Sequence, residues 1–126
     1  FGDGALELAL RADHGEEDQG GGPIWRVQGE NDYYVCRWNP LESNFRVYCV
    51  QGGERRQLAS AEVAAAPGAW HTIRVEQTGE RSVCTFDGTT RLEVTDATLP
   101  QAGGVGLWTK ADAATSFDAL RISIRH

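Results

Sequence analysis

Long polar side chains are concentrated in residues 37–48, RWNPLESNFRVY, where two arginines, two asparagines and a glutamate interrupt an apolar background. Guanidinium groups form fork-like pairs of hydrogen bonds with carboxylates, and amide groups both donate and accept. Residues of these types can recognise a sugar or a carboxylate when they share one surface. The question is which face of which element carries them.

A second group of the same kind lies in LWTKAD at 107–112. Trp108 and Lys110 fall on one face of the expected strand, and Asp112 follows at once. The tryptophan can pack under a loop with its N–H satisfied. Alternatively it offers a flat stacking surface for a pyranose ring, with a cation and an anion nearby for the hydroxyls. Both interpretations stay open.

Several other chemistries lack the residues that they need. The chain has no G-x-S-x-G and no cysteine beside a histidine, so no serine or cysteine nucleophile is indicated. Gly20, Gly21 and Gly22 precede a strand rather than a helix, which argues against a phosphate loop. We expect no cofactor.

Cysteine and histidine spacing gives no metal site. The chain contains no C-x-x-C, and its three histidines are widely scattered. An odd number of cysteines leaves at least one without an internal partner, and we interpret Cys36, Cys49 and Cys84 as small buried hydrophobic residues rather than as a disulfide framework. Acids at 13 and 16–18 allow a calcium loop, but a solvated charge run is the preferred interpretation.

Composition narrows the class of partner. The net charge of −6 argues against binding to nucleic acid or to an anionic membrane surface. No apolar run is long enough for a transmembrane segment. The length of 126 residues fits one domain, over 1–126. The chain starts at Phe1 and has no leader pattern, so we expect either a cytoplasmic protein or, preferably, a segment whose leader has been removed.

Period-2 alternation between turn residues recurs roughly every eight to twelve residues, which is typical of an all-β sandwich or barrel. The expected strands are 4–11, 22–28, 32–39, 43–50, 54–60, 69–77, 80–86, 89–94, 103–109 and 116–125. Asp87-Gly88 is the strongest indication of a two-residue hairpin.

Alternation also sorts the side chains of 22–50 onto two faces. One face is apolar, with Trp25, Tyr34, Cys36, Trp38, Phe45, Val47 and Cys49. If the three strands are neighbours, the other face gathers Arg26, Tyr33, Arg37, Asn39, Asn44, Arg46 and Tyr48. Like charges on adjacent strands repel. Either Glu42 and other acids neutralise them in a solvated network, or the face is a cleft that awaits a ligand.

The runs GGGPIWR (20–26), NDYYVCRWNPLESNFRVY (31–48), WHTIRV (70–75), DATLPQAGGVGLWTKAD (96–112) and SFDALR (116–121) resemble the bacterial concanavalin A-like domains known as 3-keto-disaccharide hydrolase domains, which are similar to family 16 glycoside hydrolases. The resemblance covers nearly the whole chain from about residue 4. It implies a jelly-roll sandwich of two antiparallel sheets, a sugar-related concave face, and a periplasmic or cell-surface location. Such domains usually carry more sequence ahead of this region.

The resemblance also assigns site residues. Its R-x-N-x-L-E-x-N pattern falls on Arg37, Asn39, Leu41, Glu42 and Asn44, its G-x-x-W-R pattern on Arg26, and its G-L-W-T-K-A-D pattern on Lys110 and Asp112. The closely spaced carboxylates of family 16 glycosidases, which retaining hydrolysis requires, are missing here.

Two functions remain. The preferred one is an extracytoplasmic, non-catalytic module that binds a saccharide or a sugar-derived ligand, or an accessory subunit of a larger assembly with a protein partner. The alternative is a hydrolase or lyase that acts on 3-keto-disaccharides or related glycosides. Glu42 or Asp112 would then accept a proton, and Arg37, Arg46 or Lys110 would stabilise the enolate.

Overall fold

The computed structural model describes residues 1–125, and all ten of its regular elements are strands. They are β1 (Asp3–His14), β2 (Gly22–Gly29), β3 (Asp32–Asn39), β4 (Asn44–Gln51), β5 (Glu54–Glu62), β6 (Trp70–Thr78), β7 (Arg81–Phe86), β8 (Thr90–Thr95), β9 (Gly104–Trp108) and β10 (Ala114–Arg125). Every expected strand is present, and each end lies within three residues of its expected position.

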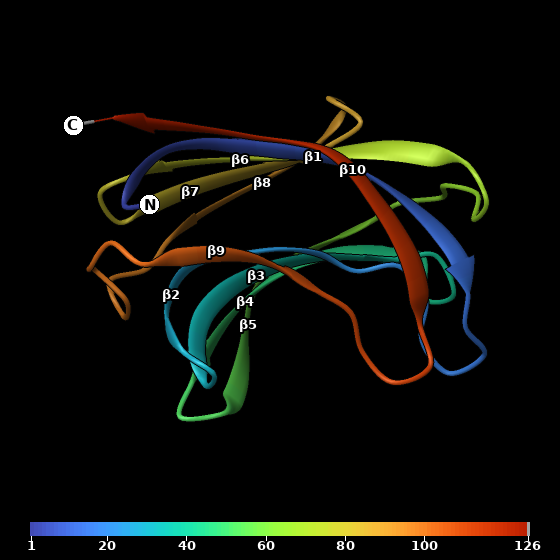
Figure 1. Cartoon of the computed structure of the whole chain (residues 1–126), viewed down its shortest axis with the longest axis horizontal. Helices are drawn as coiled ribbons and strands as arrows, with labels where there is room; N and C mark the ends of the chain where they lie inside the picture. Colours follow the sequence, from blue (N-terminus) through green and yellow to red (C-terminus); the bar gives the residue numbers. More distant parts are fainter. Residues whose placement is uncertain (126) are drawn as a thin grey trace.

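The strands form two five-stranded antiparallel sheets that pack face to face (Figure 1). Sheet A has the order β10-β1-β6-β7-β8, and sheet B has the order β5-β4-β3-β2-β9. This arrangement confirms the expected fold class, an all-β jelly-roll sandwich. No helix in residues 1–125 has the length and apolarity to cross a membrane.

Alternating side chains of both sheets fill the space between them. Leu6, Leu8 and Leu10 of β1 are fully buried there, opposite Trp25 and Trp38 of sheet B. Removing this apolar surface from water is the main favourable term in folding. Cys36, Cys49 and Cys84 are buried in the same core and form no disulfide, which confirms their interpretation as small core residues.

The β7–β8 hairpin shows why Asp87-Gly88 is such a strong turn pattern. Asp87 and Gly88 both adopt positive φ, 51° and 69°, as a type I′ turn requires. The Thr89 N–H donates to the Phe86 carbonyl at 3.1 Å. The strand ladder resumes at the pair Phe86 and Thr90, so the loop contains three residues rather than the two expected.

Arg26 is the main departure from simple alternation. It has φ of 49°, and the ladders of β2 with both neighbouring strands shift register around it. Such a bulge reverses which face a side chain occupies. Arg26 is therefore only 3% exposed, at one end of the sandwich. The prediction that it shares a face with Arg37 and Arg46 is wrong.

The Arg26 guanidinium joins three separate segments at that end of the sandwich. It donates to the carbonyls of Gly2 at 3.2 Å, Leu99 at 3.0 Å and Gly79 at 2.7 Å. It also forms an ion pair with Asp3 at 3.2 Å. A buried charge is tolerated when it is this fully hydrogen-bonded. Arg26 therefore has a structural role.

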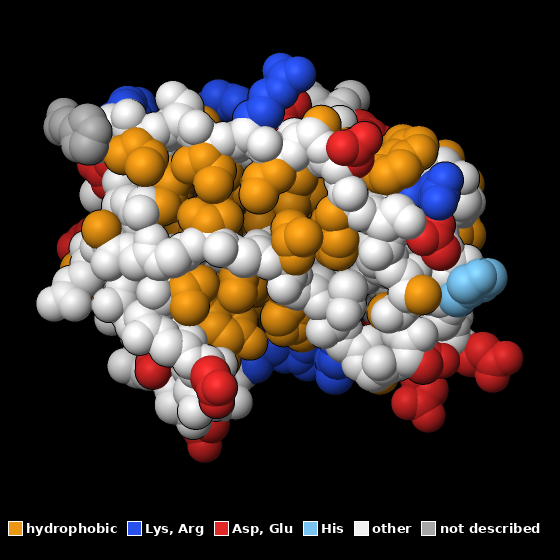
Figure 2. All heavy atoms as spheres, viewed as in Figure 1, with side chains coloured by type: hydrophobic (Ala, Val, Ile, Leu, Met, Phe, Trp, Pro, Cys, Tyr) orange, Lys and Arg blue, Asp and Glu red, His pale blue; other side chains and the backbone are white. Residues whose placement is uncertain are grey.

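Sheet B is arched, and its outer face is the concave one (Figure 1). The β2–β3 and β4–β5 hairpins project on one side of this face, and segments 14–21 and 109–113 project on the other. In the side view of Figure 2, Lys and Arg atoms are recessed between two projecting acidic tips at the lower margin.

Candidate functional site

The register of β3 and β4 places four predicted polar residues on the outer face of sheet B. Arg37 lies directly opposite Arg46, and Asn39 lies directly opposite Asn44. Residues that pair directly across two antiparallel strands point to the same face. The neighbouring positions Trp38, Phe45 and Val47 point into the core. These two pairs form one patch, as the alternation predicts.

Glu42 lies at the centre of this patch. Its carboxylate accepts from Asn39 Nδ2 at 3.0 Å and from Asn44 Nδ2 at 3.1 Å. It also lies 3.4 Å from Arg37 Nη2 and 3.8 Å from Arg46 Nη1. We call these five residues the arginine cluster. One carboxylate thus lies within ion-pair distance of two opposed guanidinium groups while its own side chain stays 45% exposed.

Arg37 is almost completely covered although it lies on an outer face. Its guanidinium carbon lies 5.9 Å from the ring centroids of both Tyr48 and Trp108, within the range of cation–π attraction. Asp18 approaches Arg37 Nη1 to 4.0 Å. The Arg37 Nε is buried and has no hydrogen-bond partner, and the same is true of Asn44 Oδ1. Buried polar groups are normally hydrogen-bonded, so these two atoms are candidates to contact a water molecule or a ligand.

A glycine brings Trp108 close to Arg37. Gly22 of β2 pairs with Trp108 of β9. A Cβ at Gly22 would meet the carbonyl oxygen of Cys36 at 1.8 Å and the Cα of Arg37 at 3.5 Å. The absence of a side chain lets β2 approach β3 closely at this point, and the Trp108 ring reaches toward the arginine across it.

The other half of the face is aromatic and aliphatic. Val35, Tyr48 and Val50 form a small buried cluster, against which Ile24, Tyr33 and Trp108 pack. The Tyr48 hydroxyl accepts from Arg46 Nη1 at 3.4 Å, and Arg46 Nε donates to Ser60 at 3.1 Å. An apolar surface thus borders the arginine cluster on the same sheet.

Asp112 acts as a clamp between two loops. Its carboxylate accepts from the backbone N–H groups of Glu16 at 2.7 Å, Glu17 at 3.1 Å and Asp18 at 3.1 Å. These hydrogen bonds, those of Glu16 and Asp18 above all, hold the pKa of Asp112 below its usual range. Such a carboxylate is a poor proton acceptor. Lys110 is exposed in the loop that follows β9.

Sequence reasoning missed three participants. Asp18 belongs to the acidic run of the glycine-rich loop, yet its Oδ1 accepts from Asn39 Nδ2 at 3.2 Å and faces Arg37. Arg55 covers the Tyr48 ring with its guanidinium carbon 4.6 Å from the centroid. Ser60 is the third. No local pattern marks these residues, because each comes from another segment and meets the cluster only after folding.

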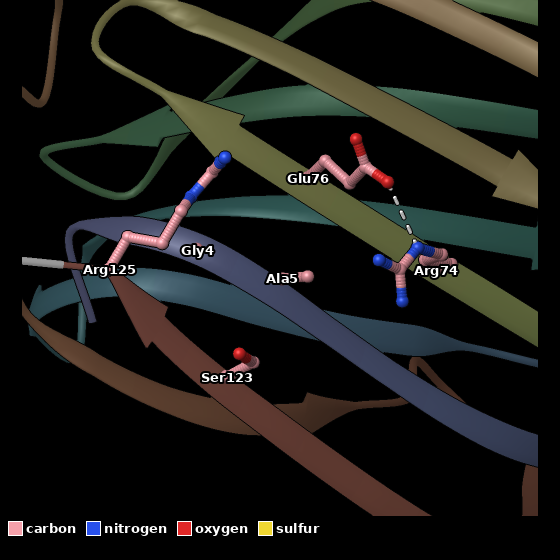
Figure 3. A pocket seen from close by; sticks show the side chains of 6 residues that line it. All are labelled: Gly4, Ala5, Arg74, Glu76, Ser123 and Arg125. Atoms are coloured by element: carbon pink, nitrogen blue, oxygen red, sulfur yellow. Dashed lines mark hydrogen bonds and ion pairs between the residues drawn. The ribbon is translucent and has the colours of Figure 1, made fainter.

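The outer face of sheet A is a different kind of surface. A hollow of about 210 Å³ there is lined by Gly4, Ala5, Arg74, Glu76, Ser123 and Arg125 (Figure 3). Arg74 is already paired with Glu76 at 3.1 Å and with Glu7 at 3.4 Å. No aromatic ring is among the residues that line this hollow. Flat ring surfaces and convergent polar groups characterise ligand sites, so the arginine cluster is the better candidate.

Metal-ligating groups are not gathered anywhere in residues 1–125. No set of three or more histidine, cysteine, aspartate or glutamate side chains in that range is arranged to hold an ion. The acids at 16–18 instead surround the Asp112 clamp through their backbone groups. The chemistry of the candidate site therefore comes from guanidinium, carboxylate, amide and aromatic groups.

This fold is shared with solved sandwich proteins. The carbohydrate-binding module CBM66 from Bacillus subtilis superposes with a TM-score of 0.88 at 16% identity, covering 98% of this chain and 76% of that chain. Chicken galectin 2 gives a TM-score of 0.70 at 10% identity, covering 95% and 89%. A mutant of the GH43 protein BlXynB from Bacillus licheniformis gives 0.71 at 15% identity, covering 97% of this chain but only 27% of that one. No family model and no curated protein matches the sequence.

Proposed function

We propose that this protein is a non-catalytic saccharide-binding module whose site is the outer face of sheet B. The observation that carries the proposal is the setting of Arg37. Its guanidinium lies 5.9 Å from two aromatic centroids and contacts Glu42, a carboxylate with 45% of its side chain exposed. Buried donors, an accessible acceptor and ring surfaces meet at one point.

A sugar matches this combination of groups. Its hydroxyls both donate and accept, so they can bridge the guanidinium groups, the Glu42 carboxylate and the amides of Asn39 and Asn44. The C–H surface of a pyranose ring is apolar enough to pack on Trp108. The arginine cluster thus forms hydrogen bonds with the sugar hydroxyls and selects for their arrangement, and Trp108 contributes apolar contact area.

The comparisons support the proposal at the level of fold. One similar structure is a carbohydrate-binding module and another is a galectin. Function still has to be argued from the site, because one fold serves many purposes. The resemblance to 3-keto-disaccharide hydrolase domains supports a sugar or sugar-derived ligand. It also supports a periplasmic or extracellular location and a place in a larger assembly, which cell fractionation and co-purification would test.

Binding to a glycan array of neutral and uronic-acid oligosaccharides tests the proposal, followed by calorimetry on the hits. We expect Trp108→Ala and Arg37→Met to lower affinity at least about tenfold. Trp70→Ala is the matched control, since Trp70 is 47% exposed on sheet A and stacks on Arg11 at 5.1 Å. If no saccharide binds, or if the Trp70 variant loses as much affinity as the Trp108 variant, the proposal is overturned.

A second function is favoured by the exposure of Glu42 beside two arginines. In that case the module cleaves 3-keto-glycosides, with Glu42 as the proton acceptor and the guanidinium groups as enolate stabilisers. The other carboxylate predicted to be catalytic, Asp112, is held by three backbone amides that lower its pKa, which makes it a poor proton acceptor. Incubation with a 3-keto-glucoside separates the functions. If the protein turns over the 3-keto-glucoside and the Glu42→Gln variant does not, the protein is an enzyme. If it binds the compound without turnover, the non-catalytic module is supported.

A further inference from the structure

The two edge strands β9 and β10 leave the interior of the sandwich open on one side. β10 is the terminal strand of sheet A, and β9 is the terminal strand of sheet B. Between them Figure 2 shows a broad apolar surface at the centre of the view. On the opposite side, β5 and β8 contact each other across the sheets.

The residues at this open edge are core residues by position. Ile122 pairs with Leu6, and Ile124 pairs with Gly4. Leu6 is fully buried, so Ile122 points to the inner face as well. Ile122 and Ile124 nevertheless stay 45% and 52% exposed. Leu120 of β10 and Leu107 of β9 are also exposed. We call these four residues the open edge.

The backbone of β10 also has one side without a neighbouring strand. β10 runs for twelve residues and pairs with β1 alone among the described strands. Alternate N–H and C=O groups on its outer side therefore lack a ladder partner in residues 1–125. A long apolar edge strand of this kind is a template for another strand.

The charges on the outward face of β10 indicate the chemistry of that strand. Arg121 and Arg125 alternate with the inward isoleucines and lie directly across from Glu7 and Asp3 of β1. Within residues 1–125, those two carboxylates form their ion pairs with Arg74 and Arg26 rather than with Arg121 and Arg125. Arg74, the next arginine, is already paired with Glu76 (Figure 3). Among residues 1–125, Arg125 donates to the Gln77 carbonyl at 3.2 Å and to the Thr78 hydroxyl at 2.9 Å.

We propose that the open edge is a β-strand addition site for an extended peptide segment in which apolar residues alternate with glutamate or aspartate. The segment pairs antiparallel to β10 and extends sheet A. Its apolar side chains cover Ile122, Ile124 and Leu107, and its carboxylates lie beside Arg121 and Arg125. Main-chain hydrogen bonds supply affinity in this mode of recognition, and the alternate side chains supply specificity. The inference is independent of saccharide binding.

The probe is a synthetic peptide of alternating valine and glutamate that matches β10 in length, with a valine and lysine peptide as its control. Fluorescence anisotropy should show saturable binding of the acidic peptide and about tenfold weaker binding of the basic one. Hydrogen exchange should slow at β10 amides. The proposal is overturned if neither peptide binds, if both bind equally, or if protection falls outside β10.

Matched variants locate the site. Ile122→Ser should weaken peptide binding, and Leu41→Ser should leave it unchanged, although Leu41 is 46% exposed and Ile122 is 45% exposed. Arg121→Glu should reverse the preference between the two peptides. If hydrogen exchange at β10 amides slows at high protein concentration without any peptide, the occupant is a second copy of this chain. That result would overturn the proposal. Sedimentation of the free protein checks that outcome.

Discussion

Arg37 and Arg46 are direct cross-strand partners, and a single carboxylate, that of Glu42, lies 3.4 Å from one guanidinium and 3.8 Å from the other. Two opposed like charges destabilise a strand pair. Glu42 offsets that repulsion from the turn between the same two strands, where 45% exposure also leaves it open to a ligand.

Glu42→Gln should therefore lower the free energy of unfolding by about 1 kcal/mol, because the two arginines lose their common counter-ion. Urea unfolding at low and high salt measures the change, and the loss should shrink in high salt as the repulsion is screened. In the Glu42→Gln background, Arg46→Gln should restore part of the stability. If the losses of unfolding free energy in the Glu42→Gln and Arg46→Gln single variants simply add in the double variant, Glu42 and Arg46 are not coupled.

Arg26 gives a second prediction. Arg26→Gln should lower the free energy of unfolding by about 3 kcal/mol, because three carbonyls and Asp3 lose a buried donor at once. Arg91→Gln is the control. Arg91 is 54% exposed in an ion pair with Glu93, so its removal should change stability by less than about 0.5 kcal/mol. Thermal melts of both variants test this prediction. If the Arg26 variant is no less stable than the Arg91 variant, Arg26 has no structural role.

Acid sensitivity should depend partly on Asp96. Burial raises the pKa of this carboxylate, but hydrogen bonds from Arg56, Tyr34 and Thr98 outweigh it and lower the pKa to about 2. The folded pKa lies below the unfolded one, so the stabilisation is present above about pH 4 and is lost as the pH falls toward 2.

Asp96→Asn should accordingly cost about 1–2 kcal/mol at pH 7, after allowance for solvent screening at this partly exposed position. The variant and the parent should converge in stability near pH 2. Unfolding free energies measured from pH 7 to pH 2 test the prediction. A difference that stays constant across the range would show that packing, and not the charge, is responsible.

The three thiols should be inert in the folded protein. Burial raises the pKa of Cys36 well above its usual range and also raises that of Cys49, so little reactive thiolate forms near neutral pH. A thiol reagent should label none of them in buffer and all three in denaturant. Rapid labelling of one thiol under native conditions would contradict the core placement.

Alternation was sufficient to predict most of the fold. It located all ten strands, and it placed Arg37, Asn39, Asn44 and Arg46 on one face, because a regular strand turns every second side chain to the same side. The same rule fails at Arg26. One residue at positive φ adds a bulge that no periodicity reveals.

The sequence by itself determined the order of strands and turns and the polar character of one sheet face, because these follow from local backbone geometry and from the period of the side chains. Only the tertiary structure decided that Asp18 would meet Arg37 and Asn39, that Asp112 would clamp the 16–18 loop, and that Ile122 and Ile124 would line an open edge. Those relationships join segments distant in the chain. They depend on how two whole sheets pack, which no local pattern records.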